Sequence, residues 1–252
     1  MKKLFEKNEV TFAVVLIIIY VVGSSVILNI FEDELVQNIA GAAFNAVMTV
    51  LLFIFIRKND LMKHVGLCRP EVSAAKMWFY IPLILCGTLP LFFGIGLRQP
   101  PAVVAFHTVS MLFVGFLEEV IFRGFLFKGI CKNSVPRAII ISSITFGIGH
   151  IVNLFNGYDL FSNIVQIVFA VAVGFLLVFI FHRTGSLIAC IGFHSLNNSV
   201  NSFASGEFLL NALGSEELAG IAVAGVKIVI TAVYLIYVIK LPEKRLTVDS
   251  KQ

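Results

Sequence analysis

Eight long stretches of mostly apolar residues constrain the fold of this chain more than any other feature. They cover residues 10–30, 35–56, 78–97, 102–127, 138–155, 164–181, 186–203 and 218–239. A helix needs about 20 such residues to cross the hydrocarbon layer of a bilayer. Helices also satisfy their own backbone groups in lipid, and these stretches lack the alternation of barrel strands. We therefore predict an all-α, polytopic membrane protein, a bundle of eight transmembrane helices.

Composition leaves no room for a separate soluble domain. Of the 252 residues, 58% are hydrophobic and 13% are charged, against about 45–50% and 25% in soluble domains. The apolar run at 10–30 is longer than the roughly 7–15 residues of a signal-peptide core, which predicts an uncleaved first span. The four cysteines form no C-x-x-C pair, which favours free thiols. We expect one membrane-embedded domain over residues 1–252.

Basic residues gather in alternate loops. Lys and Arg are frequent at both chain ends and in the loops at 57–77 and 128–137, whereas Arg98 is the only one in the intervening set of loops. The net charge of +4 is therefore a topology signal and does not indicate a nucleic-acid partner. By the positive-inside rule, both termini are predicted to be cytoplasmic.

Three of the predicted spans carry side chains that packing alone does not explain. They are Glu118, Glu119 and Arg123; Phe146 and His150; and His194 and Asn198. A charge at the bilayer centre costs at least about 2.5–3.5 kcal/mol, which favours a function. Residues four apart share a helix face. At 1.5 Å per residue, the first glutamate and both histidines lie about 15–20 Å from the cytoplasmic ends of their spans. The spacing predicts that three helices bring a carboxylate and two imidazoles to one depth.

These residue types are sufficient for hydrolysis. A carboxylate can take a proton from water, and an imidazole can orient that water or protonate a leaving amine. His and Asn can donate hydrogen bonds to an oxyanion. We assign Glu118 as the water-activating base and Glu119 as the residue that holds Arg123. Spacing alone does not distinguish the two glutamates.

In their order along the chain, the patterns E-E-x-x-x-R, F-x-x-x-H and H-x-x-x-N formed by these residues resemble those of the CPBP family. This family comprises the type II CAAX prenyl endopeptidases and the bacteriocin-processing or Abi proteins of bacteria. The resemblance covers residues 115–201, the predicted core. It implies that Glu118 and His150 activate water, and that His194 and Asn198 stabilise the oxyanion. The second glutamate and the arginine support them.

The same resemblance implies a setting for the reaction. The family fold is an eight-helix bundle around a cavity open to the cytoplasmic side. The expected protein lies in a bacterial plasma membrane and cleaves a peptide or lipidated protein that enters from the cytoplasmic face. Membrane lipid is the other expected partner.

The sequence leaves the cofactor open. Glu118, His150 and His194 suit a divalent metal such as zinc with a free fourth position. No H-E-x-x-H pair makes that site specific. A metalloprotease and a metal-free glutamate protease both remain compatible with these residues.

Two other functions also fit the intramembrane charges. One is a proton- or cation-coupled transporter, although the broken, paired helices common in transporters are not evident. The other is a non-catalytic bacteriocin-immunity membrane protein. Two further histidines, His107 and His182, are predicted to bond to neighbouring helices. Lys227, in the last span, has no predicted partner.

Overall fold

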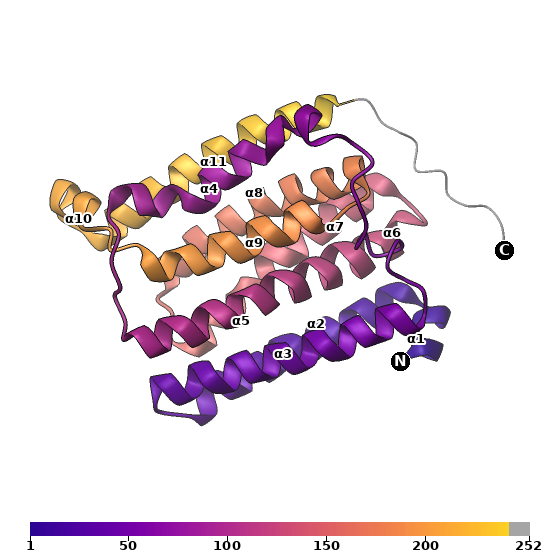
Figure 1. Cartoon of the computed structure of the whole chain (residues 1–252), viewed down its shortest axis with the longest axis horizontal. Helices are drawn as coiled ribbons and strands as arrows, with labels where there is room; N and C mark the ends of the chain where they lie inside the picture. Colours follow the sequence, from indigo (N-terminus) through magenta and orange to yellow (C-terminus); the bar gives the residue numbers. More distant parts are fainter. Residues whose placement is uncertain (242–252) are drawn as a thin grey trace.

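The computed structural model describes residues 1–241, which form helices joined by loops, without a β-strand in that range (Figure 1). The α-helices are α1 (Lys2–Lys7), α2 (Glu9–Ile30), α3 (Glu34–Lys58), α4 (Ile81–Thr88), α5 (Pro101–Glu119), α6 (Lys128–Cys131), α7 (Val135–Ile148), α8 (Leu160–Thr184), α9 (Ile188–Val200), α10 (Glu207–Leu213) and α11 (Glu216–Lys240). The other helical segments are the 3-10 helices η1 (Ala74–Tyr80), η2 (Leu89–Phe93), η4 (Gly149–Asn156) and η5 (Asn201–Phe203) and the π-helix η3 (Val120–Phe127).

Seven helices of the described residues are long and apolar enough to cross a membrane, judged by length and composition. They are Glu9–Ile30, Glu34–Lys58, Ala74–Phe93, Pro101–Cys131, Val135–Asn156, Leu160–Thr184 and Glu216–Lys240. They confirm an all-α integral membrane protein. The predicted span at 186–203 is not among them, because α9 begins at Ile188 and ends at Val200. It is followed only by the short η5, so this helix falls below the usual crossing length.

The outer surface of the bundle is apolar and the interior holds ionisable groups. Ile18, Leu51 and Val229 are each more than half exposed, whereas Glu119 and Arg123 are fully buried. In a soluble protein, large apolar side chains are mostly buried and charged side chains are mostly exposed. The arrangement is that of a helix bundle whose outer side chains contact lipid and whose polar side chains face one another.

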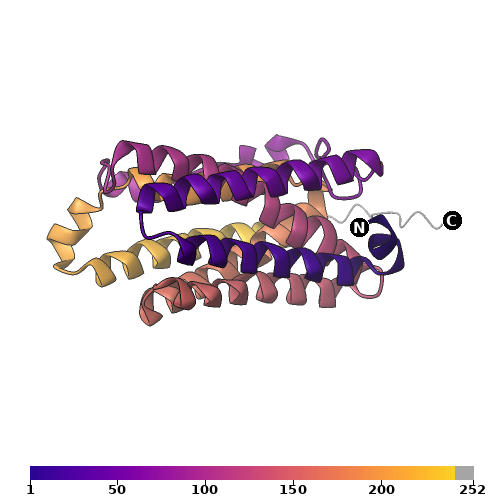
Figure 2. The same cartoon turned by 90° about the horizontal axis from the view of Figure 1, so that it is seen from below.

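The long helices run along one common direction (Figures 1 and 2). Helix α5 packs on α3 and on α9; α9 also packs on α4, and α7 packs on α8. Helix α11 covers α8 and α4, while α2 contacts the π-helical segment η3. Helices α5 and α9, which are far apart in the sequence, therefore meet directly, and α7 contacts η3, the continuation of α5.

The helix that carries both glutamates changes its winding at the site. Helix α5 ends at Glu119, and η3 continues it as a π-helix whose eight residues are all buried. π-Helical segments are rare in proteins, and those that occur often lie at functional sites. Arg123 lies in this π-helical stretch, one turn beyond Glu119.

A glycine allows α9 to approach α5 closely enough to reach these residues. A Cβ atom on Gly115 would lie 2.2 Å from the Ser195 hydroxyl and 2.7 Å from the Ser195 backbone nitrogen. Backbone cannot yield as a flexible side chain can. Ser195 also donates a hydrogen bond to the carbonyl of Leu112, at 3.3 Å. Gly115 thus sets the distance between the two helices.

We expect Gly115→Ala to destabilise the folded protein by about 1–3 kcal/mol, because the added methyl overpacks this contact. Gly192→Ala is the matched control, since no atom lies within 4 Å of a Cβ built at Gly192 of α9. Thermal unfolding in detergent measures both. Equal unfolding temperatures for the two variants would contradict the close contact.

Candidate active site

A buried carboxylate holds both a guanidinium and an imidazole. Arg123 donates from Nη1 to Oε1 of Glu119 at 3.2 Å, and Nδ1 of His194 lies 2.8 Å from the same oxygen. Both Glu119 and Arg123 have side chains that are 0% exposed. Because a carboxylate oxygen only accepts, Nδ1 of His194 carries the proton. Nε2 of His194 is thereby left for other partners.

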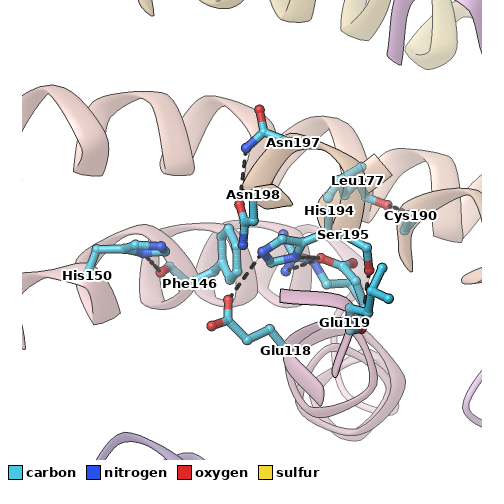
Figure 3. Close-up of polar contacts among 12 residues, drawn as sticks. Glu118, Glu119, Phe146, His150, Leu177, Cys190, His194, Ser195, Asn197 and Asn198 are labelled. Atoms are coloured by element: carbon cyan, nitrogen blue, oxygen red, sulfur yellow. Dashed lines mark hydrogen bonds and ion pairs between the residues drawn. The ribbon is translucent and has the colours of Figure 1, made fainter. Parts of the chain in front are cut away.

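The second glutamate faces this imidazole from the other side. Oε2 of Glu118 lies 3.6 Å from Nε2 of His194, and Oε1 accepts a hydrogen bond from the Tyr20 hydroxyl at 2.8 Å. Figure 3 shows Glu118 pointing toward His194. The Glu118 side chain is 14% exposed, so unlike Glu119 it can reach water. The two adjacent glutamates therefore occupy different environments.

The Phe146 ring stands between the two imidazoles (Figure 3). Its centroid lies 5.4 Å from that of His150 and 5.6 Å from that of His194, both edge-on. The Arg123 guanidinium lies over the same ring at 4.0 Å, a cation–π contact. Nδ1 of His150 lies 3.1 Å from the Phe146 carbonyl oxygen, an acceptor, so Nδ1 bears the proton and Nε2 is free. Phe146 thus contacts Arg123 and both histidines of the site.

Two cavities meet at these side chains. The first, of about 660 Å³, is lined by His194, Asn198 and Lys227. The second, of about 710 Å³, is lined by Glu118 and Tyr20. Phe146 and His150 line both. Glu118 and His194 therefore line adjoining cavities that have Phe146 and His150 in common.

Both cavities extend toward the loops at one end of the bundle. Their linings include Arg98, and further Glu34 in the second and Glu216 and Glu217 in the first. These residues lie at the end with α10, at the left of Figure 1, whereas the N-terminus lies at the other end. If the basic loops and the termini lie in the cytoplasm as predicted, this end of the bundle is the non-cytoplasmic one, whereas the family resemblance implies a cavity open to the cytoplasmic side.

The predicted metal ligands are not assembled as a group. No three His, Cys, Asp or Glu side chains of residues 1–241 are grouped so that they could hold a metal ion. Glu118 is 3.6 Å from His194, but the Phe146 ring separates His194 from His150 (Figure 3). The three donors Glu118, His150 and His194 thus do not fit a common ion in this arrangement, and we derive no step through one.

Several residues to which the sequence analysis gave no role at the site have contacts that the structure now shows. Tyr20 comes from α2, 98 residues from its partner Glu118. Lys227, which had no predicted partner, donates to Asn197. His107 lines the second cavity, and His182 packs edge-on against Phe127. A polar side chain inside an apolar span was a signal for Lys227, but Tyr20 is an ordinary residue in such a span.

Residues 100–200 match a family model described as Type II CAAX prenyl endopeptidase Rce1-like. The matched segment begins just before α5 and ends at the last residue of α9. It contains both glutamates, Arg123, Phe146 and both site histidines. No curated protein and no solved structure matches the chain.

Proposed function

The chain belongs to the CPBP family through its Rce1-like segment, and from this premise we propose that it is an intramembrane endopeptidase. Its substrate is a membrane-associated, prenylated peptide or protein, and no nucleic acid takes part. The observation that carries the proposal is Glu118, held by Tyr20 and facing His194 inside the matched segment. A carboxylate that reaches water beside an oriented imidazole supports hydrolysis.

Each site residue has a role in the proposed reaction. Glu118 takes a proton from water, and the hydroxide adds to the scissile carbonyl. His150 orients that water by accepting a hydrogen bond at Nε2, and the proton that Glu118 has taken then passes through this nitrogen to the leaving amine. Asn198, and His194 once protonated at Nε2, donate hydrogen bonds to the oxyanion.

The remaining pair supports this reaction without meeting the substrate. Glu119 and Arg123 are fully buried, so they hold His194 and Phe146 in place. A carboxylate bonded to an imidazole fixes the tautomer and the ring orientation.

The reaction is tested with purified protein in liposomes and an internally quenched, farnesylated peptide ending in a CAAX sequence. We expect cleavage that is detected by fluorescence and mass spectrometry. Proton or cation flux that responds to pH, without cleavage, would instead support a transporter. A cellular phenotype unaltered by Glu118→Gln would support a non-catalytic immunity protein.

We expect the activity to survive metal removal, because the donors Glu118, His150 and His194 do not converge on one point. The measurement is the cleavage rate after dialysis against EDTA, together with the zinc content of active protein. Loss of the rate on chelation, with recovery on adding zinc, would contradict the glutamate-protease assignment and favour a metalloprotease.

We further propose that α9 crosses the membrane as the eighth helix of a single domain, with residues 115–201 as its core and both termini in the cytoplasm of a bacterial cell. The basic loops support this orientation. Since the cavities extend to the opposite end, substrate then enters from the non-cytoplasmic side. This proposal differs from the cytoplasmic entry that the family resemblance implies, and the orientation of the helices distinguishes the two.

Orientation is tested by labelling single cysteines in intact cells, with the four native cysteines replaced by alanine. A cysteine at Asp33, exposed in the loop before α3, is expected to react with an impermeant maleimide. A cysteine at Asn133, exposed in the loop before α7, is expected to react only after lysis. The reverse pattern would place the cavities on the cytoplasmic side.

A further inference from the structure

Lys227 is a buried cation that the proposed reaction does not yet use. It lies in α11, is 5% exposed and lines the first cavity together with His194 and Asn198. None of the carboxylates in residues 1–241 forms an ion pair with it. Its ammonium lies 5.4 Å from the centre of the Phe169 ring. Burying a charge without a counter-ion is costly, so its contacts call for a functional explanation.

The ammonium begins a chain of hydrogen bonds that ends at Asn198. Nζ of Lys227 donates to Oδ1 of Asn197 at 2.9 Å, and Nδ2 of Asn197 donates to Oδ1 of Asn198 at 3.2 Å. An ammonium has donors only, so the oxygen of Asn197 must face it. The amide nitrogen of Asn197 is then turned toward Asn198, which must present its own oxygen.

These two hydrogen bonds determine whether the oxygen or the nitrogen of the Asn198 amide faces the site. With its oxygen held by Asn197, the Nδ2 group of Asn198 is directed away from Asn197. Figure 3 shows this nitrogen on the side of His194 and Phe146. In the part of the chain that the structure describes, no acceptor is bonded to it. A donor is therefore presented to the cavity.

We propose that Lys227 is a positioning residue that, through Asn197, holds the Asn198 amide with its donor toward the developing oxyanion. The terminal torsion of an asparagine is broad and roughly two-fold. If the amide turned over, an oxygen would face the oxyanion and oppose its charge. A donor fixed before the reaction needs no reorganisation during it. This inference rests on the proposed endopeptidase function.

The first test is Lys227→Met, with the farnesylated quenched peptide in liposomes. Complete loss of an oxyanion donor lowers kcat by about 10²–10³-fold. Lys227→Met leaves the Asn198 donor present but no longer held in place, so we expect kcat to fall by at least about tenfold and by no more than about 10³-fold. KM is expected to change by less than about threefold, because the interaction strengthens only in the transition state. Lys227→Arg, which retains donors, is expected to recover part of kcat. Lys240→Met is the control, since Lys240 is exposed at the end of the same helix.

Asn197→Asp separates positioning from a structural role. Aspartate gives Lys227 a counter-charge, so folding is preserved, but it has no amide donor for Asn198. We expect kcat to fall although thermal stability is kept. In an Asn198→Ala background, Lys227→Met is expected to have no further effect on kcat, because both changes remove the same interaction.

Several results would overturn the inference. Unchanged kcat in both Lys227→Met and Asn197→Asp would do so. An increase in KM confined to peptides with a free C-terminal carboxylate, and absent with amidated peptides, would instead show that Lys227 binds substrate directly. A wild-type protein that does not cleave the peptide would overturn the proposed function and this inference together, whereas an active wild type with active variants overturns the inference alone.

Discussion

Glu118→Gln is expected to lower the rate of peptide cleavage by about 10²–10⁴-fold, because glutamine cannot take the proton from water. The substitution keeps the shape of the side chain and an oxygen that still accepts from Tyr20 at the position of Oε1. The fold is therefore expected to remain intact. The measurement is the initial rate in liposomes, with thermal unfolding recorded on the same preparations.

Glu207→Gln is the control for this prediction, since Glu207 is exposed at the start of α10 and lines neither cavity. It removes one negative charge from the protein without touching the site. A folded Glu118→Gln protein that cleaves the peptide as fast as this control would exclude Glu118 as the base. Inactivity with an unchanged unfolding temperature would support the assignment.

Glu119→Gln is expected to lower the stability of the folded protein, in contrast to Glu118→Gln, which is expected to lower only the activity. It leaves the fully buried guanidinium of Arg123 without its counter-charge. Breaking a buried ion pair from one side costs about 3–5 kcal/mol. The unfolding temperature is therefore expected to fall sharply, unlike that of Glu118→Gln. Unfolding in detergent can be followed with a thiol-reactive dye, because Cys86 and Cys190 are buried in the folded protein.

The double variant Glu119→Gln/Arg123→Met provides the matching control. It removes both charges and keeps an apolar side chain near the Phe146 ring, so part of the lost stability is expected to return. Activity is expected to stay low, because His194 loses the carboxylate that orients it. If the double variant were less stable than Glu119→Gln alone, the ion pair would not be the source of the effect.

Sequence reasoning singled out a candidate site because ionisable groups are rare in apolar spans. The pairs Glu119–Arg123 and Phe146–His150 follow from four-residue spacing on one helix, and both contacts are present in the structure. Helical content and seven of the predicted crossings follow from apolar length alone. These features are local, so a single stretch of sequence contains the information for them.

The remaining features depend on how separate helices pack. The spacing could not distinguish Glu118 from Glu119, since only the approach of α9 and α2 gives them different partners. The same holds for the hydrogen bond between Lys227 and Asn197, which joins α11 to α9. The short length of α9 was also not evident, because the sequence does not show that residues 201–203 leave the α-helix and form the short η5.

The end of the bundle toward which the cavities extend was not evident from the sequence, for a related reason. The distribution of Lys and Arg indicates which loops face the cytoplasm. It contains no information on which end of the bundle is hollow. That is decided by packing, with Phe125 and Phe127 buried toward the N-terminal end and Glu34 and Arg98 lining space at the other.

Cleavage of the farnesylated peptide by the wild-type protein in H₂¹⁸O tests the central claim most directly. Water that is activated at Glu118 and attacks the scissile carbonyl leaves one ¹⁸O in the new carboxyl group, and mass spectrometry is expected to find it there. Labelled product should form about 10²–10⁴-fold more slowly with Glu118→Gln. A folded wild-type protein that leaves the peptide intact, or releases product without the label, would contradict hydrolysis at this site.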